Sequence, residues 1–77
     1  MDEQSHLRAQ LLQSDPEFHR LADQHHALDD RLQQLTDKHY LSEPEHVEEV
    51  TLKKRKLQLK DRMETILRQY SAAARHH

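Results

Sequence analysis

The sequence has no cysteine and no glycine among its 77 residues. Without cysteine the chain can form no disulfide framework, no thiolate zinc finger, no iron–sulfur cluster and no cysteine nucleophile. Without glycine it lacks the backbone freedom on which phosphate-binding loops, dinucleotide fingerprints and nucleophile elbows depend. The sequence therefore excludes several large classes of enzymes and cofactor-binding proteins.

Apolar and aromatic residues are also scarce. Leu, Ile, Val and Phe make up 16 of the 77 residues, and the aromatic side chains are one Phe and two Tyr. No apolar run approaches the roughly 20 residues of a transmembrane helix. Asp2 and Glu3 stand where a signal peptide would be basic. We expect a soluble cytoplasmic protein that makes no membrane contact and has a small core as an isolated monomer.

The charges of the chain are nearly balanced but unevenly placed. Twelve basic and 14 acidic residues leave a net charge of −2, which argues against a general binder of polyanions. Residues 1–40 carry 8 acidic and 4 basic side chains, whereas residues 41–77 carry 6 acidic and 8 basic ones. The two halves are therefore expected to attract each other.

Two similar strings, SDPE at residues 14–17 and SEPE at 42–45, predict the starts of helices. In each, the Ser hydroxyl can accept a hydrogen bond from a free backbone amide, Pro suits the first turn, and the Glu completes a capping box. We expect one long helix over 16–39 and a second over 44–70. A short helix over 3–13 precedes them, and the tail 71–77 is expected to fray.

The apolar residues of the first long helix follow the a and d positions of a heptad repeat, and His25 and His39 fill the remaining steps. The second long helix has two apolar faces, one with Val47, Val50 and Leu57 and the other extending from Leu52 to Tyr70. One partner helix cannot cover both faces. We therefore expect the chain to form oligomers.

The predicted fold is all-α: an antiparallel, coiled-coil-like hairpin of two helices, with the short N-terminal helix, in a single domain over 1–77 that assembles into a helical bundle. Residues lying side by side in the hairpin have numbers that sum to about 84. The expected helix–helix interface comprises Phe18, Leu21, His25, Leu28, Leu32, Leu35, Val50, Leu52, Leu57, Leu59, Met63 and Ile66. The expected charge pairing joins acidic residues of the first helix to basic residues of the second, namely Asp29 and Asp30 to Lys53, Lys56 and Lys60.

Two strings of this sequence resemble those of a known family. The string DQHHALDDRL at residues 23–32 matches a His-x-x-Leu-Asp pattern, and LKKRKLQLKD at 52–61 matches a Leu-Lys-Lys-x-Lys-Leu-x-Leu-Lys-Asp pattern. Both are typical of the YdcH-like family of small bacterial proteins, and together they cover about residues 18–67. The resemblance implies a helical hairpin that tends to self-associate. It implies no enzymatic activity and supplies no catalytic residues.

Histidine is unusually frequent, with 8 of 77 residues. His19, His25 and His26 each precede an Asp by four residues, but no third ligand completes a metal site within either helix. We therefore expect no metal and no other cofactor. His25 lies among the heptad apolar positions, where we predict that it hydrogen-bonds the second helix near Leu59 or Lys60; the alternative is a ring at the edge of the hairpin, half exposed to water.

These observations favour a non-enzymatic protein that acts by association with itself, as a dimer or tetramer, and with another protein as an adaptor or regulator. One alternative is a His-dependent helical protein that responds to metal or pH. A second is nucleic-acid binding through the basic stretch 53–62, which is less favoured because consecutive basic residues point in different directions around a helix and few aromatics are available for stacking. We expect no enzyme, since a hairpin alone has no concave site that excludes water.

Overall fold

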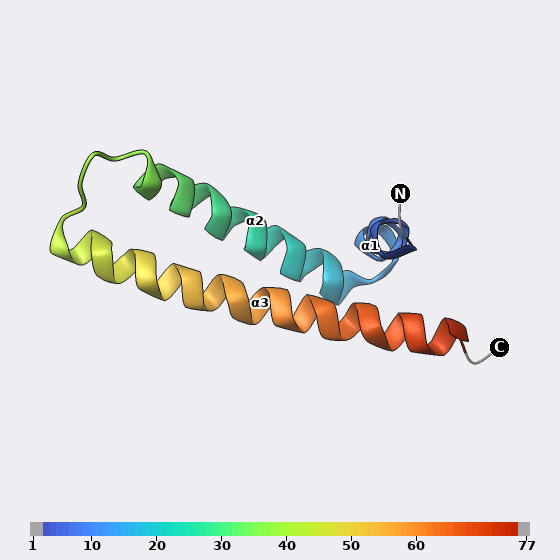
Figure 1. The fold of residues 1–77 in the computed structure, drawn as a ribbon. Coiled ribbons are helices and arrows are strands. Elements are labelled where there is room, and N and C mark those ends of the chain that lie inside the picture. Colours follow the sequence, from blue (N-terminus) through green and yellow to red (C-terminus); the bar gives the residue numbers. More distant parts are fainter. Residues whose placement is uncertain (1–2, 76–77) are drawn as a thin grey trace.

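The computed structural model describes residues 3–75, which form three helices and no strands. They are α1 (Glu3–Ser14), α2 (Pro16–Thr36) and α3 (Glu43–Arg75). α2 and α3 lie side by side and run in opposite directions, and α1, seen end-on in Figure 1, crosses the open end of this pair. The all-helical class predicted from the sequence is thus confirmed.

The start of α2 is capped by Asp15, one residue later than predicted. The Asp15 carboxylate accepts a hydrogen bond from the Phe18 backbone amide at 3.0 Å. Ser14, the predicted cap, is the last residue of α1, and its hydroxyl donates back to the Gln10 carbonyl. The correction arises because α1 continues up to Ser14, so only Asp15 is left free to cap the next helix.

The start of α3 has the predicted capping box. The Ser42 hydroxyl accepts from the Glu45 backbone amide at 3.3 Å, and the Glu45 carboxylate accepts from the Ser42 amide at 2.9 Å. Two free amides are satisfied reciprocally in this arrangement, which stabilises the first turn of the helix. The two similar strings of the sequence therefore begin helices by different hydrogen bonds.

Both long helices end at other residues than predicted. α2 ends at Thr36 and not at residue 39, because the backbone amide of Lys38 turns back to the Leu35 carbonyl and its side chain pairs with Glu45 across the turn. α3 continues to Arg75, so residues 71–75 of the predicted frayed tail are helical. The alanines in this segment are strong helix formers and nothing there interrupts the helix. Residues 76 and 77 lie outside the described residues.

The apolar core lies where the three helices meet. Five buried side chains form one cluster, namely Leu11, Phe18, Met63, Ile66 and Leu67. Leu7, Leu21 and Ala22 are partly buried and pack against this cluster. The register predicted for the pair is consistent with this cluster, since Phe18 and Ile66 share it and Leu21 packs against the cluster that holds Met63. α1 packs on its own chain through Leu11, which is 2% exposed, whereas Leu12 points outward.

Candidate interaction surface

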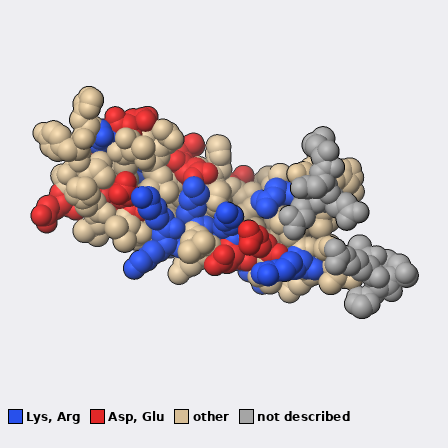
Figure 2. Space-filling view, viewed as in Figure 1, with Lys and Arg blue, Asp and Glu red and all other residues tan. Residues whose placement is uncertain are grey.

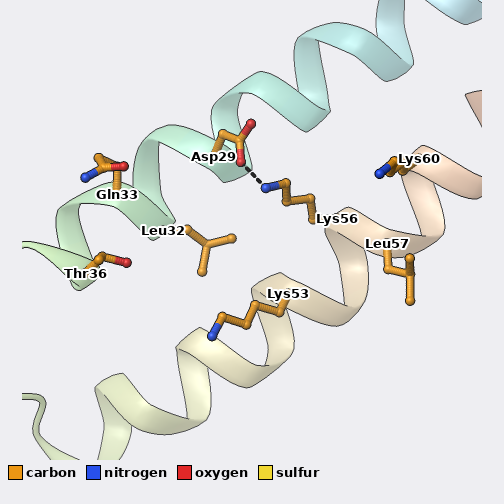
Figure 3. A pocket seen from close by; sticks show the side chains of 8 residues that line it. All are labelled: Asp29, Leu32, Gln33, Thr36, Lys53, Lys56, Leu57 and Lys60. Atoms are coloured by element: carbon orange, nitrogen blue, oxygen red, sulfur yellow. Dashed lines mark ion pairs between the residues drawn. The ribbon is translucent and has the colours of Figure 1, made fainter.

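A groove of about 460 Å³ lies between the long helices, on one side of the α2–α3 pair. We call it the lysine groove; Figure 3 shows its eight lining residues, which are Asp29, Leu32, Gln33, Thr36, Lys53, Lys56, Leu57 and Lys60. Three of the eight are lysines, all from α3. Six of the eight had been selected from the sequence as interface or charge-pairing residues.

An ion pair crosses the lysine groove from α2 to α3. The Lys56 ammonium contacts the Asp29 carboxylate, as predicted for this pair (Figure 3). The hydrogen bond from Lys56, together with its positive charge, lowers the pKa of Asp29 below its ordinary value. Lys56 is thus neutralised within the chain and ties the two helices together at the middle of their length.

The other predicted charge-pairing residues have different contacts. Asp30 lies near the ring of His26 at 3.6 Å, and its side chain is 66% exposed. Lys53 is 3.9 Å from Glu49 on its own helix. No acidic side chain among the described residues forms an ion pair with Lys60. Two of the three groove lysines therefore keep most of their charge available to a molecule outside the chain.

The predicted helix–helix interface falls into three groups. Five of its residues are buried: Phe18, Leu32, Leu35, Met63 and Ile66. Five are partly buried along the same contact: Leu21, His25, Leu28, Leu52 and Leu59. Val50 and Leu57 lie outside the contact within the chain, because they are on the second apolar face of α3, which points away from α2.

His25 does not make the predicted hydrogen bond to the second helix. Its Nδ1 atom lies 3.8 Å from the Asp29 carboxylate on its own helix, and its side chain is 26% exposed. No hydrogen bond to α3 is found for this ring within the described residues. A histidine four residues before an Asp has a partner on its own helix, and its ring reaches water at the edge of the pair, which is the alternative that the sequence left open.

The second apolar face of α3 is exposed to solvent. Val47, Val50 and Leu57 are 66, 53 and 59% exposed. Their spacing of three and seven residues places them along one stripe of the helix. Lys54 occupies the intervening step of the stripe, where its methylene stem is apolar. We call Val47, Val50 and Leu57 the outer stripe.

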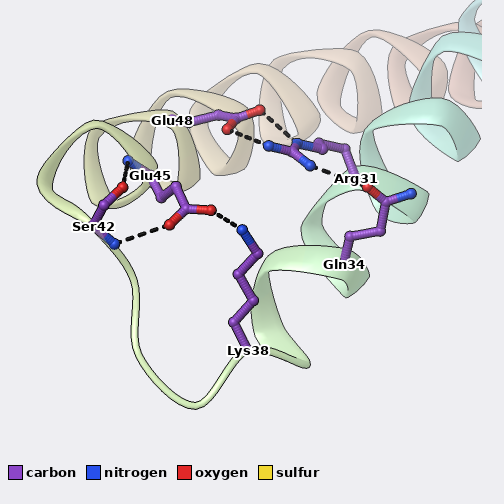
Figure 4. Close-up of polar contacts among 6 residues, drawn as sticks. All are labelled: Arg31, Gln34, Lys38, Ser42, Glu45 and Glu48. Carbon is purple, nitrogen blue, oxygen red and sulfur yellow. Dashed lines mark hydrogen bonds and ion pairs between the residues drawn. The ribbon is translucent and has the colours of Figure 1, made fainter.

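A polar network holds the turn between α2 and α3 (Figure 4). The Arg31 guanidinium donates two hydrogen bonds, of 2.7 and 2.8 Å, to the Glu48 carboxylate, and this contact lowers the pKa of Glu48. Beside it, Lys38 pairs with Glu45. The bond from Lys38, with those from Ser42, lowers the pKa of Glu45 to about 2. Neither pair was predicted from the sequence, although the acid–base complementarity of the two halves pointed toward them.

A second set of polar contacts borders the core at the other end of the pair. The Tyr70 hydroxyl donates to the Asp15 carboxylate at 2.9 Å, and Arg62 pairs with Glu17 at 3.1 Å. The hydrogen bond from the Phe18 backbone amide, and after it that from Tyr70, lower the pKa of Asp15. These contacts were also missed, because an acidic cap and a tyrosine 55 residues apart share no sequence pattern.

The basic stretch of α3 is partly used within the chain. Figure 2 shows Lys and Arg side chains gathered along the middle of the molecule, with acidic side chains next to them. Three of the six basic residues between 53 and 62 form ion pairs with acidic residues, namely Lys53, Lys56 and Arg62. A nucleic acid would have to compete with these carboxylates for the paired basic side chains.

Two further comparisons concern metals and membranes. Within residues 3–75, no three side chains of the His, Cys, Asp or Glu type come together in a metal-binding group. The His and Asp of each pair spaced four residues apart lie close together, at 3.2 Å for His19–Asp23, 3.8 Å for His25–Asp29 and 3.6 Å for His26–Asp30. No helix in the described part of the chain is both long enough and apolar enough to cross a bilayer.

Comparison with known protein families matches residues 18–67 to DUF465, a family described as proteins of unknown function. No curated protein and no solved structure matches the chain. The matched segment includes all of α2 except its first two residues, the turn, and α3 as far as Leu67. It contains both strings on which the resemblance rested and the whole lysine groove, but not α1. Since the match covers more than half of the 77 residues, the chain belongs to this family of small, YdcH-like bacterial proteins.

Proposed function

We propose that the protein has no catalytic role and acts by association of its helical surfaces, first with a second copy of itself and then with a partner protein that it recruits or regulates. In this proposal α2 and α3 form a hairpin that pairs with another hairpin in a four-helix bundle. The observation that carries the proposal is the outer stripe, which lies on α3 opposite the face that packs against α2.

The outer stripe is exposed because no other helix of the described residues covers this side of α3. α3 has 33 residues, and α2, with 21, covers one face of it. Val47, Val50 and Leu57 are each more than half exposed, and they are aligned. Apolar side chains in such an alignment are the pattern by which helices pair with other helices. Association would remove this apolar surface from water and so be favourable.

The lysine groove supports association better than catalysis. The ion pair of the groove, Asp29 with Lys56, joins α2 to α3 and so has a structural role, which agrees with association. The groove combines apolar side chains with lysines, which suits a partner helix that is both apolar and acidic.

The test is sedimentation equilibrium of untagged, metal-free protein over a wide range of concentrations. We expect a dimer or larger assembly for the natural chain. The triple variant Val47→Ser, Val50→Ser, Leu57→Ser should be monomeric, with its helix content by circular dichroism unchanged. Tyr40→Ser is the matched control, because Tyr40 is 86% exposed but lies in the turn, away from the outer stripe.

A natural chain that remains a stable monomer at every concentration would contradict the self-association. An assembly that the triple variant leaves intact would contradict the role of the outer stripe. Once the oligomeric state is known, the partner protein can be sought with the natural chain and the triple variant side by side.

A further inference from the structure

The outer stripe ends in the middle of α3. The next residues on the same side of the helix, in the same heptad pattern, are Asp61 and Glu64, which stand four and seven residues after Leu57. Both are exposed. A second helix that covers the stripe therefore makes its apolar contact on the half of α3 nearer the turn.

The spacing of this side of α3 reads the same in both directions. From one end of the stripe to the other the steps are three, four and three residues, through Val47, Val50, Lys54 and Leu57. Two copies of α3 that run in opposite directions can therefore bring the pattern level with itself about a two-fold axis perpendicular to the helix. In that register Leu57 is level with Val47 of the other copy, and Val50 is level with Lys54.

From this geometry we infer that the second copy in the proposed assembly binds on the outer stripe with its α3 antiparallel to the first, the two-fold axis passing at the level of Leu52. The inference rests on the self-association proposed above and specifies its orientation and register. Leu57 of each copy then covers Val47 of the other, and Val50 packs against the methylene stem of Lys54. The outer stripe is thereby removed from water in both copies, which favours association.

The antiparallel pair brings together the parts of the two copies that lack a third helix. In this register residues 43–61 of α3 lie along the same residues of the second copy. The core of each chain, where α1 crosses the pair, is at the far end from the turn (Figure 1). The two cores then point away from each other, and each copy covers the uncovered half of the other.

The charges on the stripe oppose the parallel alternative. In a parallel pair each residue of the stripe faces the same residue of the other copy, so Lys54 would face Lys54, Asp61 would face Asp61, and Glu64 would face Glu64. Like charges in apposition oppose binding. The antiparallel register instead places Lys54 opposite a valine.

The borders of the antiparallel contact carry nearly balanced charge. On one border lie Lys53 and Glu49 of each copy, 3.9 Å apart within the chain. On the other border lies Thr51, which is exposed and uncharged. Where the overlap ends, Asp61 comes level with Glu43 in the first turn of α3, and the positive end of the helix dipole offsets this like charge. The apolar contact therefore supplies most of the attraction.

A second antiparallel register would suit the charges better and the apolar residues worse. Sliding the second copy by two heptads brings Lys54 level with Glu64 of the other copy. The same shift sets Leu57 opposite Asp61 and moves it away from the valines. Exposed ion pairs add little affinity singly, whereas the lost apolar contact is the main source of attraction. The register centred on the stripe is therefore favoured.

The inference is tested with single cysteines, because the natural chain has none and each cysteine can then link only to its equivalent in the second copy. In the Thr51→Cys variant the two thiols lie on one border of the contact, about 3 Å apart along the helices. A short bismaleimide should convert most of this variant into a linked dimer at concentrations where the natural chain is dimeric.

Gln58→Cys is the matched control, since Gln58 is exposed and lies one heptad further along the same border. Its two thiols are about 18 Å apart along the helices, so it should remain largely unlinked. Circular dichroism and sedimentation should show that both variants fold and associate as the natural chain does. Equal yields from the two variants, or a higher yield from Gln58→Cys, would overturn the inference.

A spin-label distance measures the orientation independently. Gln69 is exposed near the far end of α3, and Gln69→Cys gives one labelling position in each copy. The inferred pair places the two labels about 50 Å apart along the helices, the slid register about 30 Å apart, and a parallel pair at the same level. Either of the two shorter distances would overturn the inference.

The outcomes also separate this inference from the proposed function. A dimer that gives the wrong cross-linking pattern or a short label distance overturns the inference and leaves self-association in place. A natural chain that is monomeric at every concentration overturns both.

Discussion

The two ends of the molecule are held together by different forces. Where α1 crosses the α2–α3 pair, five buried side chains from three helices form an apolar cluster. Toward the turn, Leu32 and Leu35 are the buried side chains, and ion pairs such as that of Arg31 with Glu48 add to the contact between α2 and α3. Two packed helices bury only the side chains along their line of contact. A third helix packed across them also covers side chains beside that line.

This difference explains where the exposed apolar residues are. Val47, Val50 and Leu57 all lie on the half of α3 nearer the turn, beyond the reach of α1. At the end with three helices the apolar cluster is buried within the chain. At the end with two helices the outer stripe and the lysine groove are uncovered. We therefore expect stability to depend on the first end and association on the second.

The largest effect is expected from removing the side chain that α1 contributes to the core. Leu11→Ala should lower the free energy of unfolding by about 2–5 kcal/mol, because Leu11 is 2% exposed and its loss leaves a cavity. Leu12→Ala, next to it on the same helix but 37% exposed, should cost less than about 1 kcal/mol. Urea unfolding followed by circular dichroism at one protein concentration compares them. Equal losses would mean that α1 does not dock through Leu11.

A smaller effect is expected at Ser14 and Ser42, the first residues of the strings SDPE and SEPE. Ser42→Ala should cost about 0.5–2 kcal/mol, because the Ser42 hydroxyl caps α3. Ser14→Ala should change the free energy of unfolding by less than about 0.5 kcal/mol, since Asp15 is the cap of α2. Thermal unfolding of the two variants measures the difference, and the reverse order would contradict the assigned caps.

The smallest effect is expected in the pH dependence of the turn. Lys38 and Ser42 lower the pKa of Glu45 from 4.5 to about 2, so the folded state favours the charged carboxylate. The resulting stabilisation is present above pH 4.5 and is lost as the pH falls toward 2. Asp15, Asp29 and Glu48, whose pKa values are also lowered, contribute in the same direction.

Glu45→Gln should therefore make the free energy of unfolding less dependent on pH in this range. The measurement is urea unfolding of the natural chain and the variant at about pH 7 and about pH 3. The gap in stability between the two proteins should be wider at the higher pH. A gap that does not change with pH would contradict the role of the Lys38–Glu45 pair.

Local patterns of the sequence were sufficient to predict the helices and the position of the turn. Heptad spacing identified the face of α2 that holds Phe18, Leu32 and Leu35, and the SEPE string identified the capping box of α3. The same spacing identified the second apolar face of α3. These features depend on residues within one or two turns of each other, where helix geometry alone determines which side chains are neighbours.

The candidate surface could be predicted only in part. The opposite charges of the two halves led to the Asp29–Lys56 pair, but Asp30 contacts His26 within its own helix. One residue along a helix turns a side chain by about 100°, so neighbours in the sequence such as Asp29 and Asp30 point to different surroundings. The rotation of each helix about its axis decides which of them faces the partner helix, and packing sets that rotation.

By itself, then, the sequence determined that the chain is helical, where its helices begin, and that α3 has more apolar surface than one partner can cover. The tertiary structure decided that Leu11 completes the core, that Asp15 is joined to Tyr70, and that Arg31 reaches Glu48. The physical reason is the range of the interactions. Caps and periodicity act within a turn of helix, whereas these contacts require the approach and rotation of separate helices, which the packing of the entire chain determines.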